Sequence, residues 1–169
     1  SGYLKLFDFD YSTQGARPLG SLLFTAGILY GVTSEGGSSS VGSLFKINTD
    51  GTGFSLLYNF DLASGSTPQA SLLYDGTFLY GTTTYGGSYS LGVVYKIKPD
   101  GTGLSNLLDF NYATTGGYPF GSFISDGTFL YGMTSQGGAS GYGTIFKIKT
   151  DGTGYTNLLN FDYVTNGSN

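Results

Sequence analysis

The acidic residues are the first side chains to consider for chemistry, because the chain contains no His and no Cys. These two absences exclude a Ser–His catalytic pair, the usual zinc ligands and thiolate chemistry. Every acid except Glu35 recurs at an equivalent place along the chain. A catalytic acid or base normally belongs to one unsymmetrical pocket, so acids at repeated places are expected to hold turns. We therefore expect a protein that is not an enzyme.

Pairs of oxygen-bearing side chains offer a second chemistry. An Asp or Asn stands on either side of a Phe four times, as in Asp8-Phe9-Asp10. Such side chains, at i and i+2, point to the same side of a strand, as ligands of a hard cation must. Calcium takes roughly six to eight oxygen ligands, however, and the neighbouring residues are not acidic. We favour the alternative, in which these side chains accept hydrogen bonds from loop backbone, and we expect no cofactor. The calcium candidates are Asp8, Asp10, Asp61, Asp109 and Asp162.

Tyrosines on Gly-Gly loops are candidates for ligand contact. These loops differ most between the repeated copies and carry Tyr85, Tyr89 and Tyr142. Exposed aromatic rings suit stacking against sugar rings, which makes a polysaccharide a candidate partner. The same tyrosines suit packing between repeat units, and we favour that role. The loops are 35–41, 85–91 and 136–142.

The stretch Leu-Tyr-Gly-Thr-Thr-Thr-Tyr-Gly-Gly at 79–87 marks the organisation that must position all of these residues. Related stretches occur at 29–37 and 130–138. A period of about 50 residues indicates an array of identical supersecondary units. The repeat units of this single domain are 1–51, 52–101 and 102–152, with a partial unit at 153–169.

Each unit has the pattern of four short strands and gives no helix signal. Asp-Gly, as at Asp75 and Gly76 and again at Asp126 and Gly127, predicts a two-residue hairpin turn. The strand at 92–98 alternates apolar and polar residues, which predicts one solvated face. Gly81 inside a strand predicts close packing of a neighbouring unit. The four consecutive strands predicted around this glycine are 70–74, 78–84, 92–98 and 104–110, the last of which lies in the next unit.

The last strand type occurs once more than the others, at 3–9, 54–60, 104–110 and 155–161. The sequence therefore predicts an all-β fold of tandem four-stranded antiparallel blades of the β-propeller type, three full repeats plus one extra strand. The motifs L-Y-G-T-T-T-Y-G-G, G-V-V-Y-K-I-K-P-D-G-T-G and L-L-D-F resemble the repeat of Gloeobacter and Verrucomicrobia proteins over essentially the whole chain. This resemblance implies an exported, surface-associated, non-catalytic propeller-like protein and implies no substrate.

The number of blades predicts self-association. Propellers typically close with about four to eight blades, so three cannot close a ring alone. An open array exposes a blade face and strand edges, which favour association into a ring or a filament unless further blades of a longer chain cover them. We expect the extra strand to add to a neighbour's sheet. The expected assembly residues are Tyr3, Leu4, Leu6, Phe7, Phe9, Tyr155, Leu158 and Phe161.

Composition narrows the partners further. A net charge of −4 with only 11% charged residues provides no basic patch for a phosphate backbone, so we expect no nucleic-acid partner. No apolar run approaches the roughly 20 residues of a membrane helix, so we expect no membrane insertion. Low charge with abundant Gly, Ser, Thr and Tyr is typical of secreted bacterial β-proteins. We therefore expect an extracellular or cell-surface location.

Overall fold

The computed structural model describes residues 2–165, and within them the chain forms twelve strands and no helix. It follows that these residues contain no helix long and apolar enough to cross a membrane. The strands are β1 (Leu23–Thr25), β2 (Ile28–Thr33), β3 (Ser43–Asn48), β4 (Ser55–Asn59), β5 (Leu73–Tyr74), β6 (Leu79–Thr83), β7 (Val93–Ile97), β8 (Ser105–Asp109), β9 (Ile124–Ser125), β10 (Phe129–Thr134), β11 (Thr144–Lys149) and β12 (Thr156–Asn160).

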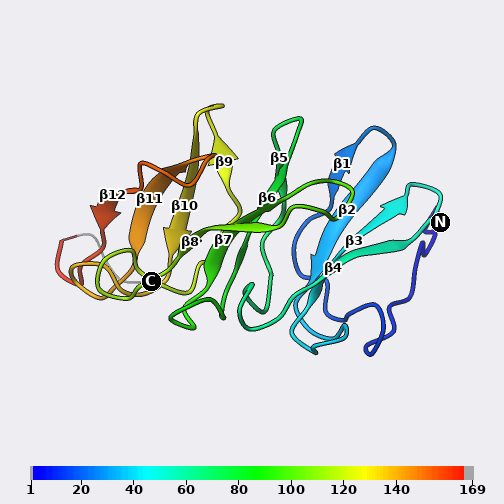
Figure 1. Cartoon of the computed structure of the whole chain (residues 1–169), viewed down its shortest axis with the longest axis horizontal. Helices are drawn as coiled ribbons and strands as arrows, with labels where there is room; N and C mark the ends of the chain where they lie inside the picture. The colour runs from blue at the N-terminus through cyan, green and yellow to red at the C-terminus, as the bar shows by residue number, and fades with distance from the viewer. Residues whose placement is uncertain (1, 166–169) are drawn as a thin grey trace.

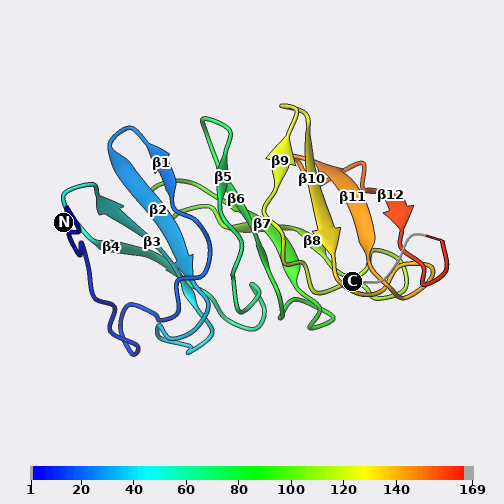
Figure 2. The ribbon, with the colours of Figure 1, turned by 180° about the vertical axis from the view of Figure 1, so that it is seen from behind.

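The strands form three antiparallel four-stranded sheets, each a meander in chain order: β1–β4, β5–β8 and β9–β12. We call these sheets blade 1, blade 2 and blade 3. They stand side by side in a row, with blade 1 and blade 3 at its two ends (Figures 1 and 2). The predicted all-β fold of three four-stranded antiparallel blades is confirmed.

The core lies between the blades. One buried cluster, which includes Tyr30, Leu44 and Leu79, joins blade 1 to blade 2. A second, which includes Tyr80 and Leu130, joins blade 2 to blade 3. Leu79 and Tyr80 are neighbours on β6, so alternate residues of the middle blade supply both clusters, as the pleat of a strand requires.

The prediction of a half-solvated third strand is wrong for blade 2. Val93 and Val94, on opposite faces of β7, are both fully buried. Blade 2 is covered on both faces by its neighbours, so the alternation of its third strand does not separate core from solvent. Lys96 is half-buried, and its Nζ lies 4.9 Å from the centre of the Phe78 ring.

The predicted two-residue turns are wider in blades 2 and 3, with four residues between β5 and β6 and three between β9 and β10. Tyr74 pairs with Leu79, so Asp75 to Phe78 lie in the turn. Asp75 Oδ1 accepts hydrogen bonds from the Thr77 and Phe78 N–H groups, both at 2.8 Å. This Asp side chain satisfies the backbone of a wider turn. In blade 1, where Ala26 replaces the Asp, Thr25 pairs with Ile28 and the turn has two residues, as predicted.

The prediction of a strand at Tyr3–Phe9 is wrong. These residues, which we call the N-terminal segment, form no strand in the described structure. A strand needs a partner for its backbone groups, and blade 1 already has its own fourth strand, β4. The N-terminal segment instead lies against the outer face of blade 1.

Candidate functional site

The outer face of blade 1, which packs on no other blade of the chain, is the first candidate surface. We call it the head face and define it as Leu22, Leu29, Phe45, Ile47 and Phe54. Leu22 is 50% exposed, whereas its equivalents Leu72 and Phe123 are 7% and 6% exposed between blades. Part of the head face is covered by the N-terminal segment, and the two enclose a hollow of ≈ 370 Å³. The head face is thus an apolar outer blade face that is only partly covered.

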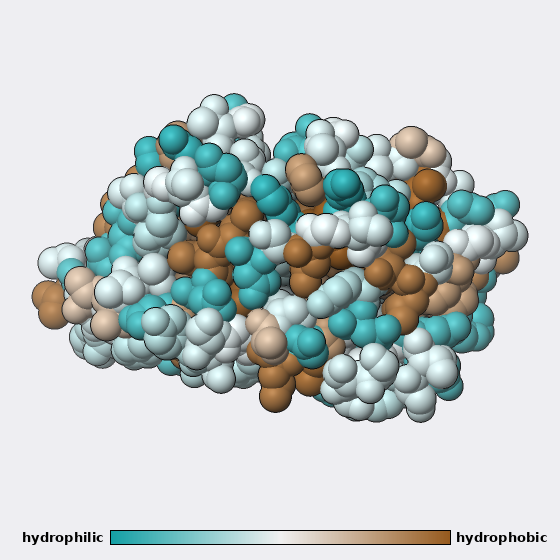
Figure 3. All heavy atoms as spheres, viewed as in Figure 1, coloured by the Kyte–Doolittle hydropathy of each residue, from teal (hydrophilic) through white to brown (hydrophobic). Residues whose placement is uncertain are grey.

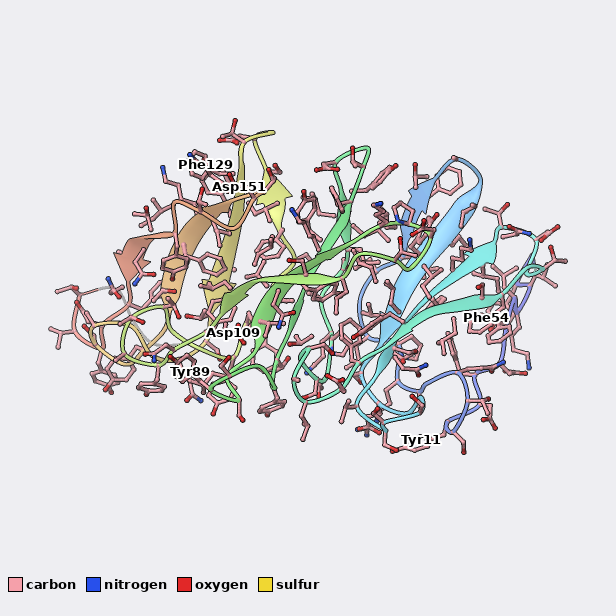
Figure 4. The ribbon with its side chains drawn as sticks, viewed as in Figure 1. Tyr11, Phe54, Tyr89, Asp109, Phe129 and Asp151 are labelled. Atoms are coloured by element: carbon pink, nitrogen blue, oxygen red, sulfur yellow. The ribbon has the colours of Figure 1, made fainter. Side chains whose placement is uncertain are left out.

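The N-terminal segment is held on the head face by aromatic contacts. The ring of Phe7 stacks on that of Phe54, with 4.2 Å between centroids, and Phe9 meets Phe45 edge-on at 5.0 Å. Phe54 lies at the end of the row next to this segment (Figure 4). Tyr3 and Leu4, at the start of the segment, remain largely exposed. Leu6, Phe7 and Phe9 therefore lie on the head face of their own chain without strand pairing, and their part in association stays a prediction.

The exposed face of blade 3 is the second candidate surface, which we call the tail face and define as Ile124, Tyr131, Met133, Ile145 and Leu159. Met133 is 51% exposed, whereas its equivalents Val32 and Thr82 are 4% and 3% exposed. A hollow of ≈ 230 Å³ is lined by Ile124, Tyr131, Met133 and Ile145. The tail face carries the same kinds of side chain as the faces of blades 1 and 2 that pack inside the chain. Hydrophobic atoms also gather in patches between polar loops on the side of the row shown in Figure 3.

The blades are also joined by two repeated hydrogen bonds. In the first, the Thr67 N–H donates to the Val41 carbonyl at 2.8 Å, and the Tyr118 N–H donates to the Leu91 carbonyl at 2.9 Å. In the second, the Ser21 N–H donates to Ser71 Oγ at 2.8 Å, and the Ser71 N–H donates to Ser122 Oγ at 2.9 Å.

If the two series of hydrogen bonds continued by one more blade in each direction, their next donors and acceptors would lie at the two ends of the row. The next donors in the series are the Arg17 N–H on blade 1 and the Ser122 N–H on blade 3. The next acceptors are Ser21 Oγ on blade 1 and the Tyr142 carbonyl on blade 3. None of these four groups has a hydrogen-bond partner within the described part of the chain. The two end faces are therefore complementary in polar groups as well as in apolar side chains.

The structure separates the other predicted assembly residues. Tyr155 is not at the tail face: its ring stacks on Phe146, and its hydroxyl donates to the Thr115 carbonyl, both within the packing between blades 2 and 3. Leu158 is exposed beside the tail face, and Phe161 is only half-buried. By contrast, Phe60 and Phe110, the equivalents of Phe161, are fully buried against the next blade.

The calcium candidates are engaged in local hydrogen bonds. Asp109 Oδ1 accepts from the Ser88 N–H at 2.8 Å, and the equivalent Asn59 and Asn160 bind the corresponding loops at 3.0 and 2.9 Å. Asp109 and Tyr89 lie together at the Gly-Gly-loop edge (Figure 4). Asp8 instead forms an exposed ion pair with Lys5 at 2.7 Å. Within residues 2–165 no cluster of three acids, His or Cys could hold a metal. The remaining candidates bind loop backbone that follows them: Asp10, Asp61 and Asp162.

The tail face has the same Tyr–Asp hydrogen bond as the face of blade 2 that packs on blade 3. The Tyr131 hydroxyl donates to Asp126 Oδ2 at 2.7 Å, as the buried Tyr80 hydroxyl does to Asp75. Asp126 accepts bonds from the Phe129 N–H, from Tyr131 and from the Thr128 N–H, and these lower its pKa to about 2. The hydrogen bond to Asp126 raises the pKa of Tyr131. Phe129 and Asp151 lie along the opposite edge from Tyr89 (Figure 4).

The loop tyrosines do not form one site. Tyr142 lies against Tyr163 at the tail end, with 6.1 Å between ring centroids. Tyr89 is exposed at a loop tip. Tyr85, however, meets Tyr118 of blade 3 edge-on at 5.5 Å. This pairing joins residues 33 positions apart and was not predicted, although the repeat register places both at the junction of blades 2 and 3.

The Tyr85–Tyr118 pair borders a shallow hollow of ≈ 270 Å³ that also includes Phe120, Ser135 and Gln136. Three aromatic rings and two neutral polar side chains thus share one surface without a charged group among them. Tyr118 adopts a φ of 55°, an uncommon conformation for a residue other than Gly. At the positions equivalent to Tyr118 and Gln136, blade 1 holds instead the Arg17–Glu35 ion pair, at 2.5 Å.

Three four-stranded antiparallel sheets packed face to face in a row define a β-propeller-type repeat array. The family model for the Gloeobacter/Verrucomicrobia repeat matches residues 73–169, more than half of the chain. The chain therefore belongs to this family, which confirms the resemblance noted in its sequence. No curated protein matches it significantly.

Solved structures share the fold. The chain is similar to one from a nidogen/laminin complex, at 20% identity and a TM-score of 0.61, over 88% of this chain and 51% of that one. The chain is also similar to the Niastella koreensis GH74 enzyme, at 19% identity and a TM-score of 0.58, over 90% of this chain and 24% of that one. It is similar to TolB from Acinetobacter baumannii at 13% identity and a TM-score of 0.53, over 80% of this chain and 30% of that one. The chain thus spans about half or less of each neighbour, and identities this low show the β-propeller fold alone.

Proposed function

We propose that the chain is a non-catalytic, self-assembling propeller module whose working surfaces are the head face and the tail face. One observation carries this proposal: the two end faces carry the same kinds of side chain that join the blades inside the chain, together with the next hydrogen-bonding groups of the same series, which have no partner among the described residues. A second copy placed head to tail would meet Met133 and Ile145 with Leu22 and Leu29. It would also pair the Ser122 N–H with Ser21 Oγ, and the Arg17 N–H with the Tyr142 carbonyl.

A closed ring of two copies is the simplest assembly. Two copies supply six blades, within the range of about four to eight in which propellers close. A contact that repeats head to tail without closing produces a filament instead. The same end faces would receive further blades if they belonged to one longer polypeptide.

The hydrogen bonds of the acidic side chains support the non-catalytic role, and the composition supports the extracellular location. The turn and loop acids bind backbone groups next to them, which leaves little for acid–base chemistry. Low charge and abundant small polar residues favour an extracellular or cell-surface location. The partner is then a further copy of the chain rather than a nucleic acid or the interior of a membrane.

The test is the mass of the purified chain across a wide concentration range, measured by sedimentation and light scattering. We expect a reversible increase in mass with concentration, and electron microscopy would distinguish rings from filaments. Met133→Asp places a charge in the centre of the tail face and should abolish association. Leu62→Asp, at an exposed apolar residue on a loop between blades, is the matched control. A monomer at all concentrations would contradict the proposal.

The hollow at Tyr85 and Tyr118 favours a second candidate function, the binding of a neutral polysaccharide. Its three aromatic rings can stack on sugar faces, and Gln136 and Ser135 supply polar groups for hydroxyls. The absence of a charged side chain from its lining favours a neutral sugar.

A glycan array followed by titration calorimetry tests this candidate. We expect binding to be lost in Tyr85→Ala and in Tyr118→Ala but retained in Tyr89→Ala, which removes an exposed ring outside the hollow. Equal loss in all three variants, or no bound glycan for the unmodified chain, would argue against this hollow as a sugar site.

A further inference from the structure

The N-terminal segment occupies the place that the fourth strand of a preceding blade would take. We propose that this place is the docking site for β12 of a second copy, and that the N-terminal segment must leave before head-to-tail association. The inference rests on the proposed self-association. It states which strand of the second copy binds here and that the N-terminal segment competes with this strand for the same place.

The equivalence is seen first in the backbone. The Leu57 carbonyl oxygen of blade 1 lies 2.5 Å from the point where a Cβ on Gly101 would stand in blade 2. The Leu107 oxygen stands in the same relation to Gly152 of blade 3, at 3.1 Å. The N-terminal segment repeats this contact on blade 1, where the Leu6 oxygen lies 2.7 Å from the corresponding point on Gly51.

The aromatic contacts repeat in the same register. Phe60, at the end of the fourth strand of blade 1, meets Tyr95 of blade 2 edge-on with 5.1 Å between centroids. Phe110 of blade 2 meets Phe146 of blade 3 in the same way at 5.4 Å. Phe9 makes this contact with Phe45, at 5.0 Å, so the N-terminal segment is in register with a fourth strand at both Leu6 and Phe9.

The natural occupant of this place is present at the other end of the chain. The residues of β12 and those that follow repeat the pattern, with Leu158 equivalent to Leu6 and Phe161 equivalent to Phe9. In a head-to-tail pair, Phe161 of one copy would therefore reach Phe45 of the next. That position is already filled by Phe9, so one of the two must give way.

The N-terminal segment is bound to the rest of the chain less strongly than β12 is. No backbone hydrogen bond joins residues 3–9 to the described part of the chain, and Tyr3 is 85% exposed. β12, by contrast, pairs with β11 in an antiparallel ladder with one bulge, and Asn160 Oδ1 accepts a hydrogen bond from the Ala139 N–H. Because β12 arrives as part of a folded blade, it should displace the N-terminal segment.

The same substitution at the two equivalent positions tests the inference. Phe9→Ala loosens the N-terminal segment and should strengthen association of the full chain about tenfold, the effect expected from losing roughly one aromatic contact. Phe161→Ala removes the incoming anchor and should weaken association by a similar factor. Association constants come from sedimentation equilibrium, and circular dichroism confirms that both variants are folded.

The outcomes separate this inference from the proposed function. If both variants weaken association, the N-terminal segment is part of the interface and the inference is overturned while self-association stands. If neither variant changes association, the copies meet through another register and the inference again fails. If neither the unmodified chain nor Phe9→Ala associates at any concentration, the proposed function fails as well.

Proteolysis gives an independent measurement, because Lys5 is the one trypsin site in the N-terminal segment. Release of this segment should make cleavage after Lys5 several-fold faster in the associated state than in the free chain. Slower cleavage in the associated state would show that the segment is covered rather than displaced, and would overturn the inference.

Discussion

The ring of Tyr95 lies over Gly81 on the adjacent strand of blade 2, and a Cβ on Gly81 would stand 2.6 Å from Tyr95 Cζ. Gly31 and Gly132 have the same relation to Phe45 and Phe146. The prediction that a neighbouring unit packs closely on this glycine is wrong, because the approaching ring comes from the next strand of the same blade. The missing side chain thus leaves room for an aromatic ring that packs between blades.

Gly81→Ala should therefore lower the free energy of unfolding by about 2 kcal/mol or more, because the fully buried Tyr95 has no room to move aside. Chemical denaturation measures this loss. Gly121→Ala is the matched control, since its Cβ would meet only Met133 Cε, at 3.6 Å. A Gly81→Ala variant as stable as Gly121→Ala would show that the ring can shift.

Two adjacent threonines on β6 should respond in opposite ways to the same change. Thr82 Oγ1 is buried without a hydrogen-bond partner in the described structure, and its equivalent in blade 1 is Val32. Thr82→Val removes an unsatisfied hydroxyl and should stabilise the fold by about 1 kcal/mol. Thr83 Oγ1 accepts from the Val93 N–H and donates to the Tyr85 carbonyl, so Thr83→Val should cost about 1–3 kcal/mol. Chemical denaturation of each variant measures its change in the free energy of unfolding. Two changes of the same sign would contradict this assignment.

The repeat period and the alternation of apolar residues determine most of the fold. They correctly predict the number of strands in each blade and the opposite faces of Leu79 and Tyr80, because both depend on local spacing. They cannot show that Val93 and Val94 are both buried, since this follows from a neighbouring blade on each side. They also overpredict a strand at Tyr3–Phe9, because strand pairing depends on a partner and not on the residues alone.

The candidate site was only partly predictable for the same reason. Association through the ends of the row follows from counting blades, and it remains a prediction. The pairing of Tyr85 with Tyr118 arises where two blades meet, and the composition of one loop does not contain that information. Aligning the residue before each proline, as at Pro68 and Pro119, with the preceding Gly-Gly loop would have indicated Tyr118.

Acid should destabilise the protein through its turns. The Thr52, Thr102 and Thr153 side chains donate to the preceding Asp and lower the pKa of each carboxyl below 3.8. A carboxyl with a lower pKa in the folded state stabilises the fold above its unfolded pKa, and this stabilisation is lost as the pH falls through the folded value. We therefore expect the melting temperature to be constant between about pH 5 and 9 and to fall steeply between about pH 4 and 2.

Asp126 provides the specific test of this acid transition, because its pKa is lowered to about 2. Tyr131→Phe removes one of the donors to Asp126, so its pKa should rise and the loss of stability should begin at higher pH. Thermal melts across this pH range, together with carboxyl titration by NMR, measure both effects. An unchanged acid profile in Tyr131→Phe would show that the backbone N–H groups alone hold the Asp126 pKa.

The role of Asp109 distinguishes a loop-holding carboxylate from a calcium ligand. Its Oδ1 accepts from the Ser88 N–H at 2.8 Å, and an amide oxygen does the same in the equivalent Asn59. Asp109→Asn should therefore be nearly neutral, whereas Asp109→Ala should cost about 1 kcal/mol because the Ser88 N–H loses its acceptor. Neither EDTA nor millimolar Ca²⁺ should shift the melting temperature. A Ca²⁺-dependent increase that disappears in Asp109→Asn would instead identify a cation site at this edge, since an amide keeps the hydrogen bond but removes the charge.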